Sequence, residues 1–169
     1  MAGLLVSDTS IIIDLERGGI LPALFRISYE IAVPDLLYER ELAPFNGPVL
    51  KQLGLKVVSV DEDGVRSAQQ YLVRQPRISL IDALSLVLTK ETEGALLTGD
   101  AALRELAEAD GVHCHGLLWV FDCLELGRIL NADELHAALD RISKHPRCRL
   151  PKNEVAVRLA RYGERQSQG

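Results

Sequence analysis

Residues 4–15 have the sequence LLVSDTSIIIDL, and this stretch sets the pattern for the rest of the chain. Leu4 to Val6 are apolar and predict a short buried strand, and the residues that follow, Ser7 to Ser10, are of types that cap helices. A second apolar run, Ile11 to Leu15, then predicts a helix. Asp8 therefore lies where a strand ends and a helix begins. In a parallel sheet this position is at the carboxyl edge, where ligands bind.

The same succession of strand and helix recurs along the chain. Strands alternating with helices predict an α/β fold, a parallel sheet of about five strands sandwiched by helices in an α/β/α arrangement. We expect one α/β domain over residues 1–143 and a basic C-terminal extension over residues 144–169, with a short helix and a disordered end. The expected strands are residues 4–6, 31–33, 57–60, 95–98 and 112–115, and the expected helices are residues 11–15, 36–42, 61–73, 79–90, 101–109, 117–126, 131–142 and 153–162.

Composition limits the class of protein. The chain has 169 residues, of which 47% are hydrophobic, which suits one globular domain with a substantial core. Its longest apolar runs, such as Leu117 to Phe121, are far shorter than the roughly 20 residues that span a bilayer. The first residues lack the charged start of a signal peptide. The sequence therefore predicts a soluble cytoplasmic protein with no membrane partner.

The cysteines give no sign of a disulfide framework or of a zinc ribbon. Cys114, Cys123 and Cys148 are odd in number and form no Cys-x-x-Cys pair. His113 and His115 flank Cys114, but on a strand the two histidines would face one way and the cysteine the other. We expect free thiols, and the absent ligand spacing disfavours zinc.

Charge is divided unevenly along the chain. The formal net charge is −5, but residues 144–169 contain seven basic and two acidic residues, so the remainder is strongly acidic. The basic segment could supply phosphate contacts that an acidic body cannot. The alternative is a solvated surface helix or a partner-binding arm.

Four acidic positions stand out: Asp8, Asp82, Asp100, and either Glu39 or Glu41. Each has an explanation that involves no ligand. Asp8 and Asp100 precede expected helices, where aspartate is a preferred N-cap, and Asp82 stands at the capping-box spacing after a serine. The two glutamates would be ordinary exposed helix charges.

Asp8 and Asp100 each follow an expected strand with only one residue between, which places both at the carboxyl edge of the sheet. Capping alone does not explain this shared position. Carboxylates that converge there repel one another, and a hard divalent cation is the usual means of neutralising them. These positions therefore predict a metal-dependent phosphoryl-transfer enzyme, most simply a nuclease.

Four segments resemble the acidic motifs of PIN-domain nucleases, including the VapC toxins of bacterial toxin-antitoxin pairs. They are LLVSDTSIIIDL (4–15), VPDLLYEREL (33–42), SLIDALSLVL (79–88) and LLTGDAALRELA (96–107), and the match spans about residues 4–125. The resemblance implies a ribonuclease acting on RNA phosphodiesters. It also implies a homodimer and a cognate antitoxin as partners.

Carried to this chain, the resemblance implies that Asp8, Asp82 and Asp100 ligate Mg²⁺ or Mn²⁺ together with one glutamate. The motif favours Glu39 for that role and leaves Glu41 as the alternative register. By the same resemblance, Thr9 and Thr98 lie beside the site. A further acid of the family pattern is replaced by Leu103 here, so the number of bound metal ions, one or two, stays open.

Two other classes of protein share part of this pattern. Haloacid-dehalogenase-like phosphatases also carry an aspartate after the first strand, but they use an Asp-x-Asp pair, and the second position here is Ser10. A catalytically weak PIN-like module that binds RNA or supports assembly is the stronger rival, because position 103 is not acidic. Loss of metal-dependent cleavage on mutation of Asp8 would exclude it.

Overall fold

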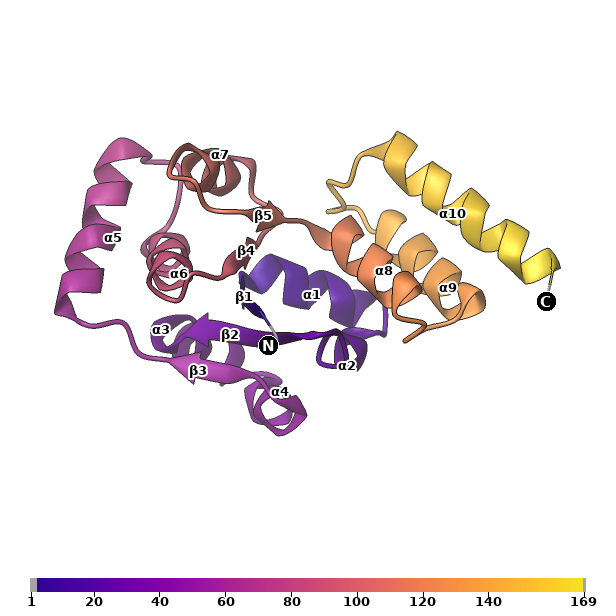
Figure 1. Ribbon diagram of the computed structural model, residues 1–169, viewed down its shortest axis with the longest axis horizontal. Helices are drawn as coiled ribbons and strands as arrows, with labels where there is room; N and C mark the ends of the chain where they lie inside the picture. The colour runs from indigo at the N-terminus through magenta and orange to yellow at the C-terminus, as the bar shows by residue number, and fades with distance from the viewer. Residues whose placement is uncertain (1–2, 169) are drawn as a thin grey trace. The chain divides into compact units, whose positions relative to one another are not determined.

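The computed structural model describes residues 3–168 and contains a five-stranded parallel sheet (Figure 1). The strands lie in the order β3-β2-β1-β4-β5, all parallel, which confirms the expected sheet. The chain moves from β1 to β2 on one side and later places β4 on the other side, so the order reverses at β1. Ligands bind at such a reversal in open α/β sheets. The strands are β1 (Gly3–Ser7), β2 (Tyr29–Pro34), β3 (Lys56–Val58), β4 (Ala95–Leu97) and β5 (Cys114–His115).

Most helices fall where the sequence predicts them. Two short helices, Leu21–Leu24 and Gly47–Leu53, were not predicted, and the helix expected over residues 36–42 is divided into a short α-helix and a π-helical turn. Both unpredicted helices carry proline in the first turn, where its fixed φ suits a helix, although proline is also common in loops. The helices are α1 (Thr9–Arg17), α2 (Leu21–Leu24), α3 (Asp35–Leu37), the π-helical turn η1 (Tyr38–Leu42), α4 (Gly47–Leu53), α5 (Glu62–Arg74), α6 (Leu80–Glu91), α7 (Ala101–Ala109), α8 (Leu117–Leu126), α9 (Ala132–Ser143) and α10 (Lys152–Ser167).

The described chain forms two compact units. The sheet unit comprises residues 3–11 and 28–116, and the helical unit comprises residues 12–27 and 117–168. The division follows contacts rather than chain order. All five strands and all four acidic motif positions belong to the sheet unit.

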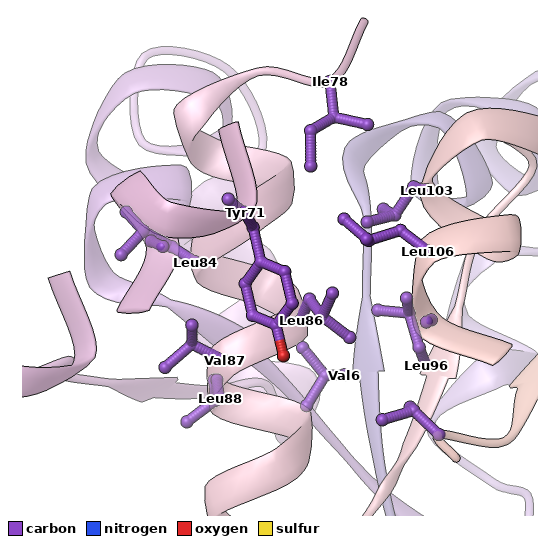
Figure 2. Packing of buried hydrophobic residues seen from close by; sticks show 14 residues of the cluster. Val6, Tyr71, Ile78, Leu84, Leu86, Val87, Leu88, Leu96, Leu103 and Leu106 are labelled. Carbon is purple, nitrogen blue, oxygen red and sulfur yellow. The ribbon is translucent and has the colours of Figure 1, made fainter. Parts of the chain in front are cut away.

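The core of the sheet unit is built around α6, whose residues Ala83 to Thr89 are all buried (Figure 2). A helix that is apolar on every side is expected at the centre of a domain. It contacts β1, β2 and β4 of the sheet as well as α5 and α7. Its N-terminal end carries Asp82, so the packing of α6 fixes where that carboxylate lies.

A polar cluster joins α5, α6 and the end of α7. The carboxylate of Asp110 accepts hydrogen bonds from Tyr71 at 2.5 Å, Arg74 at 3.0 Å and Lys90 at 3.3 Å. Arg74 is the main cause of the lowered pKa of Asp110, followed by the hydroxyl of Tyr71, and Lys90 adds to it. The cluster stabilises the folded state most when Asp110 is charged.

Asp110→Asn is expected to lower the unfolding free energy at neutral pH by about 1 kcal/mol, because the partners of Asp110 are partly solvent-screened. The folded pKa of Asp110 lies below its unfolded value, so its contribution is present above pH ~4 and is lost as the pH falls below that. Urea unfolding at several pH values measures both effects. Glu105→Gln, at an exposed position on α7, is the control. Equal acid dependence in both variants would contradict the assignment.

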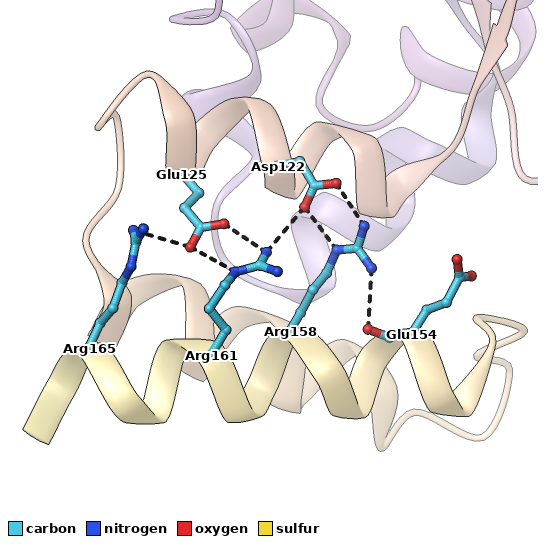
Figure 3. A network of polar contacts seen from close by, with 6 residues as sticks. All are labelled: Asp122, Glu125, Glu154, Arg158, Arg161 and Arg165. Atoms are coloured by element: carbon cyan, nitrogen blue, oxygen red, sulfur yellow. Dashed lines mark hydrogen bonds and ion pairs between the residues drawn. The ribbon is translucent and has the colours of Figure 1, made fainter.

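Several basic residues of the C-terminal segment form ion pairs within the helical unit. Arg158 donates to Asp122 at 2.7 Å, and Arg161 and Arg165 reach Glu125 at 2.8 and 3.2 Å (Figure 3). These three arginines of α10 therefore pair with carboxylates of α8. The helix continues to Ser167 and includes most of the segment expected to be disordered, and residue 169 lies outside the described residues. Within residues 3–168, no helix is both long and apolar enough to cross a bilayer.

Candidate metal site at the carboxyl edge of the sheet

Asp8 is the buried centre of the site. It follows β1 directly, its side chain is almost inaccessible at 5% exposure, and its N–H donates to the carbonyl of Leu97 at 2.9 Å. One carboxylate oxygen accepts from the Ser10 hydroxyl at 2.7 Å and from the Ile11 N–H at 3.1 Å. The other oxygen accepts from the hydroxyl of Thr98. Asp8 is thus both a helix cap and a link between two strands.

Burial raises the pKa of Asp8 above its ordinary value. The hydroxyls of Thr98 and Ser10 and the Ile11 N–H oppose this by stabilising the charged form. The negative charge of Asp82 raises the pKa further, so these two carboxylates are close enough to repel each other. The role of Ser10 was missed in the sequence, although a hydroxyl two residues after a capping aspartate was the available signal.

Thr98 brings the end of β4 to the end of β1. Its hydroxyl donates to Asp8 and also accepts from the backbone N–H of Asp100 at 3.0 Å. Asp100 is exposed, and one of its carboxylate oxygens caps α7 by accepting from the Leu103 N–H at 2.9 Å. Asp100 therefore lies at the same edge as Asp8, and Thr98 lies between them.

Asp82 forms the capping box that its spacing predicts. The Ser79 N–H donates to one oxygen of Asp82 at 3.0 Å, and the Asp82 N–H donates to the Ser79 hydroxyl at 3.1 Å. The capping explanation is therefore correct for Asp82, as it is for Asp100. Neither cap uses both carboxylate oxygens.

The two candidate glutamates lie on η1 and differ in what they contact. The Thr9 hydroxyl donates to Glu41 at 2.5 Å, which joins Glu41 to the residue next to Asp8. Glu39 is exposed, and no contact joins it to the other motif residues within residues 3–168. The turn is closed by a bond from the Ala43 N–H to the Tyr38 carbonyl, five residues back. Such a turn shifts the helical register, and π-turns are frequent at functional sites.

The side chains do not form a closed metal cage. Across residues 3–168, no three His, Cys, Asp or Glu side chains are gathered closely enough to hold a metal ion. However, Glu41, Asp82 and Asp100 each use one carboxylate oxygen within the described chain and leave the other without a hydrogen-bond partner there. Oxygen donors of this kind fit Mg²⁺ and Mn²⁺. The donor set thus suits a hard divalent cation.

Comparison with known proteins assigns the family. A family model for a PIN domain, DUF3368, matches residues 4–164, which is nearly the whole chain. The chain belongs to the PIN-domain family, as the four sequence motifs indicated, and has the fold of its nucleases. No curated protein matches it.

Thr98→Val is expected to lower the unfolding free energy by about 2 kcal/mol, because it removes a donor to a buried carboxylate at nearly constant volume. Thr92→Val is the matched control, since that hydroxyl bonds only to backbone carbonyls on an exposed helix end. Chemical denaturation measures both changes. A loss in Thr98→Val no larger than that of the control would show that Asp8 does not depend on this donor.

Proposed function

We propose that the chain is a metal-dependent ribonuclease that hydrolyses RNA phosphodiester bonds with Mg²⁺ or Mn²⁺. The observation that carries the proposal is the set of half-engaged carboxylates, Glu41, Asp82 and Asp100, beside the buried Asp8. One oxygen of each is already hydrogen-bonded, by a helix cap at Asp82 and Asp100 and by the Thr9 hydroxyl at Glu41, and the other is left for a ligand. The repulsion between Asp8 and Asp82 is relieved if a cation binds there.

The chain's own residues have separate tasks in this proposal. Asp8, Asp82, Asp100 and Glu41 would hold the cation, and Glu41 replaces Glu39 as the preferred glutamate because it contacts Thr9. Thr9 and Thr98 orient the carboxylates that they bond. The bound cation would supply an acidified water and a positive charge at the scissile phosphodiester. No covalent nucleophile is required.

The toxin role belongs to the same proposal. The resemblance of the four motifs to VapC toxins supports a cytoplasmic endoribonuclease with a cognate antitoxin and a homodimeric assembly. The family assignment supports the nuclease fold on which these finer proposals depend.

A second candidate is a PIN-like module that binds RNA or supports assembly without cutting. It is favoured by the absence of a ready three-ligand metal group among residues 3–168 and by Leu103, which is buried and apolar. Cleavage assays separate the two candidates.

Asp100→Asn is expected to abolish cleavage while preserving the fold, because asparagine caps a helix about as well as aspartate but lacks the charge. We expect a loss of roughly 100-fold or more in rate, the size of several kcal/mol of transition-state stabilisation. End-labelled single-stranded RNA incubated with Mn²⁺, Mg²⁺ or EDTA measures this.

The matched control is Asp61→Asn, because Asp61 also caps a helix, α5, but follows β3, two strands away from β1. Its cleavage rate should equal that of the native chain. Intact RNA with native protein and both metals, across several unrelated RNAs, would favour the binding module.

Mn²⁺ or Mg²⁺ is expected to raise the melting temperature of the native chain, because the cation binds only the folded arrangement of carboxylates. Asp82→Asn keeps a side-chain acceptor for the capping box but removes one charge, so its metal-induced shift should be smaller. Differential scanning fluorimetry with Asp61→Asn as control measures the shifts. Identical shifts in all three proteins would place the bound metal elsewhere.

A further inference from the structure

Arg104 lies at the carboxyl edge of the sheet, where its side chain is held by contacts with the backbone. It lies one turn after Asp100 on α7, and its guanidinium donates to the backbone carbonyl of Thr98 at 3.2 Å. Gly116 leaves the space for it, since a Cβ there would lie 3.0 Å from the same guanidinium nitrogen. The guanidinium is therefore held between the ends of β4 and β5.

Arg104 differs from the other partly buried arginines of the described chain in having no carboxylate partner. Within residues 3–168, four arginines are partly buried, and Arg17, Arg158 and Arg161 each pair with a carboxylate. Arg104 bonds only to a carbonyl, and Glu108, one turn further along α7, forms no ion pair with it in the described chain. A guanidinium has five N–H donors in a fork that matches carboxylates and phosphates. Most of these donors are left for an anionic ligand.

Thr98 connects this guanidinium to the candidate metal site. Its carbonyl accepts from Arg104, whereas its hydroxyl donates to the buried Asp8. The carboxylates of the site repel a nucleic-acid backbone, so binding requires nearby positive charge. Arg104 supplies such a charge at the same edge of the sheet unit.

We propose that Arg104 binds a backbone phosphate of single-stranded RNA, next to the bond that is cut, through a charge-assisted and bidentate contact. This inference rests on the proposed ribonuclease function and adds a substrate-positioning residue to it. The contact fixes the register of the strand against the carboxylates and carries no base preference.

A purely structural role for Arg104 makes different predictions. If the guanidinium only braced the Thr98 carbonyl, its removal would change stability but not the salt dependence of RNA binding. A phosphate contact releases counterions when RNA binds. Losing one contact therefore makes the negative slope of log K against log salt shallower, by about 0.7 for a single strand.

The test measures binding of a fluorescein-labelled single-stranded RNA of mixed sequence by anisotropy over a series of KCl concentrations. The full chain is used in an Asp100→Asn background, which prevents cleavage, and variants add Arg104→Gln, Arg104→Lys or Arg66→Gln. Arg66 is an exposed arginine of α5 that faces Asp63, so it is the matched control. Arg104→Gln should weaken binding roughly tenfold and lower the salt slope by about 0.7, whereas the control should change neither.

Arg104→Lys keeps the charge but loses the fork, so it should weaken binding while keeping the parental salt slope. A slope reduced as much as in Arg104→Gln would indicate damage to the fold and overturn the phosphate role. Unchanged affinity and slope in Arg104→Gln, with RNA cut normally by the native chain, would overturn the Arg104 inference alone. No binding by the parent and no cutting by the native chain would overturn the proposed function, and the inference with it.

Discussion

The buried carboxylate of Asp8, at the end of β1, takes one of its hydrogen bonds from Thr98, at the end of β4. Burial disfavours its charged form, and the Thr98 hydroxyl from β4 is among the groups that compensate. The strands are neighbours in the sheet but far apart in the sequence. The position and charge state of the Asp8 carboxylate therefore depend in part on the pairing of β1 with β4. It also places Asp100 beside Asp8, because the same hydroxyl accepts from the Asp100 N–H.

Helix capping and ligand binding are compatible at this edge. A carboxylate has two oxygens, and a helix N-cap needs one of them. Asp82 and Asp100 each give one oxygen to a helix N-terminus, which fixes the direction of the side chain. The second oxygen is left with an orientation already restricted by the fold. At the proposed metal site, preorganisation of this kind would lower the entropic cost of binding a cation.

Charge balance in the protein follows from which arginines have carboxylate partners. In the helical unit, Asp122 and Glu125 engage three arginines of α10, so this part of the basic segment is used in holding α10 to α8. In the sheet unit, Arg104 is held by a carbonyl instead. Arg104 lies one turn after Asp100, where a cationic group would offset part of the repulsion between the carboxylates and a polyanion.

Local patterns in the chain were enough to predict the five parallel strands, most helices, and the positions of Asp8, Asp82 and Asp100 at strand or helix ends. These features depend on apolar periodicity and capping residues, which act over a few neighbouring positions. The contact of Glu41 with Thr9, which Glu39 does not make, was visible only in the tertiary structure, because a π-turn changes the helical register and leaves no simple periodic signal. The partners of Arg104 and of the α10 arginines were also decided only in three dimensions. Their contacts join residues that are separated along the chain, and a one-dimensional pattern carries no information on which charged side chain meets which.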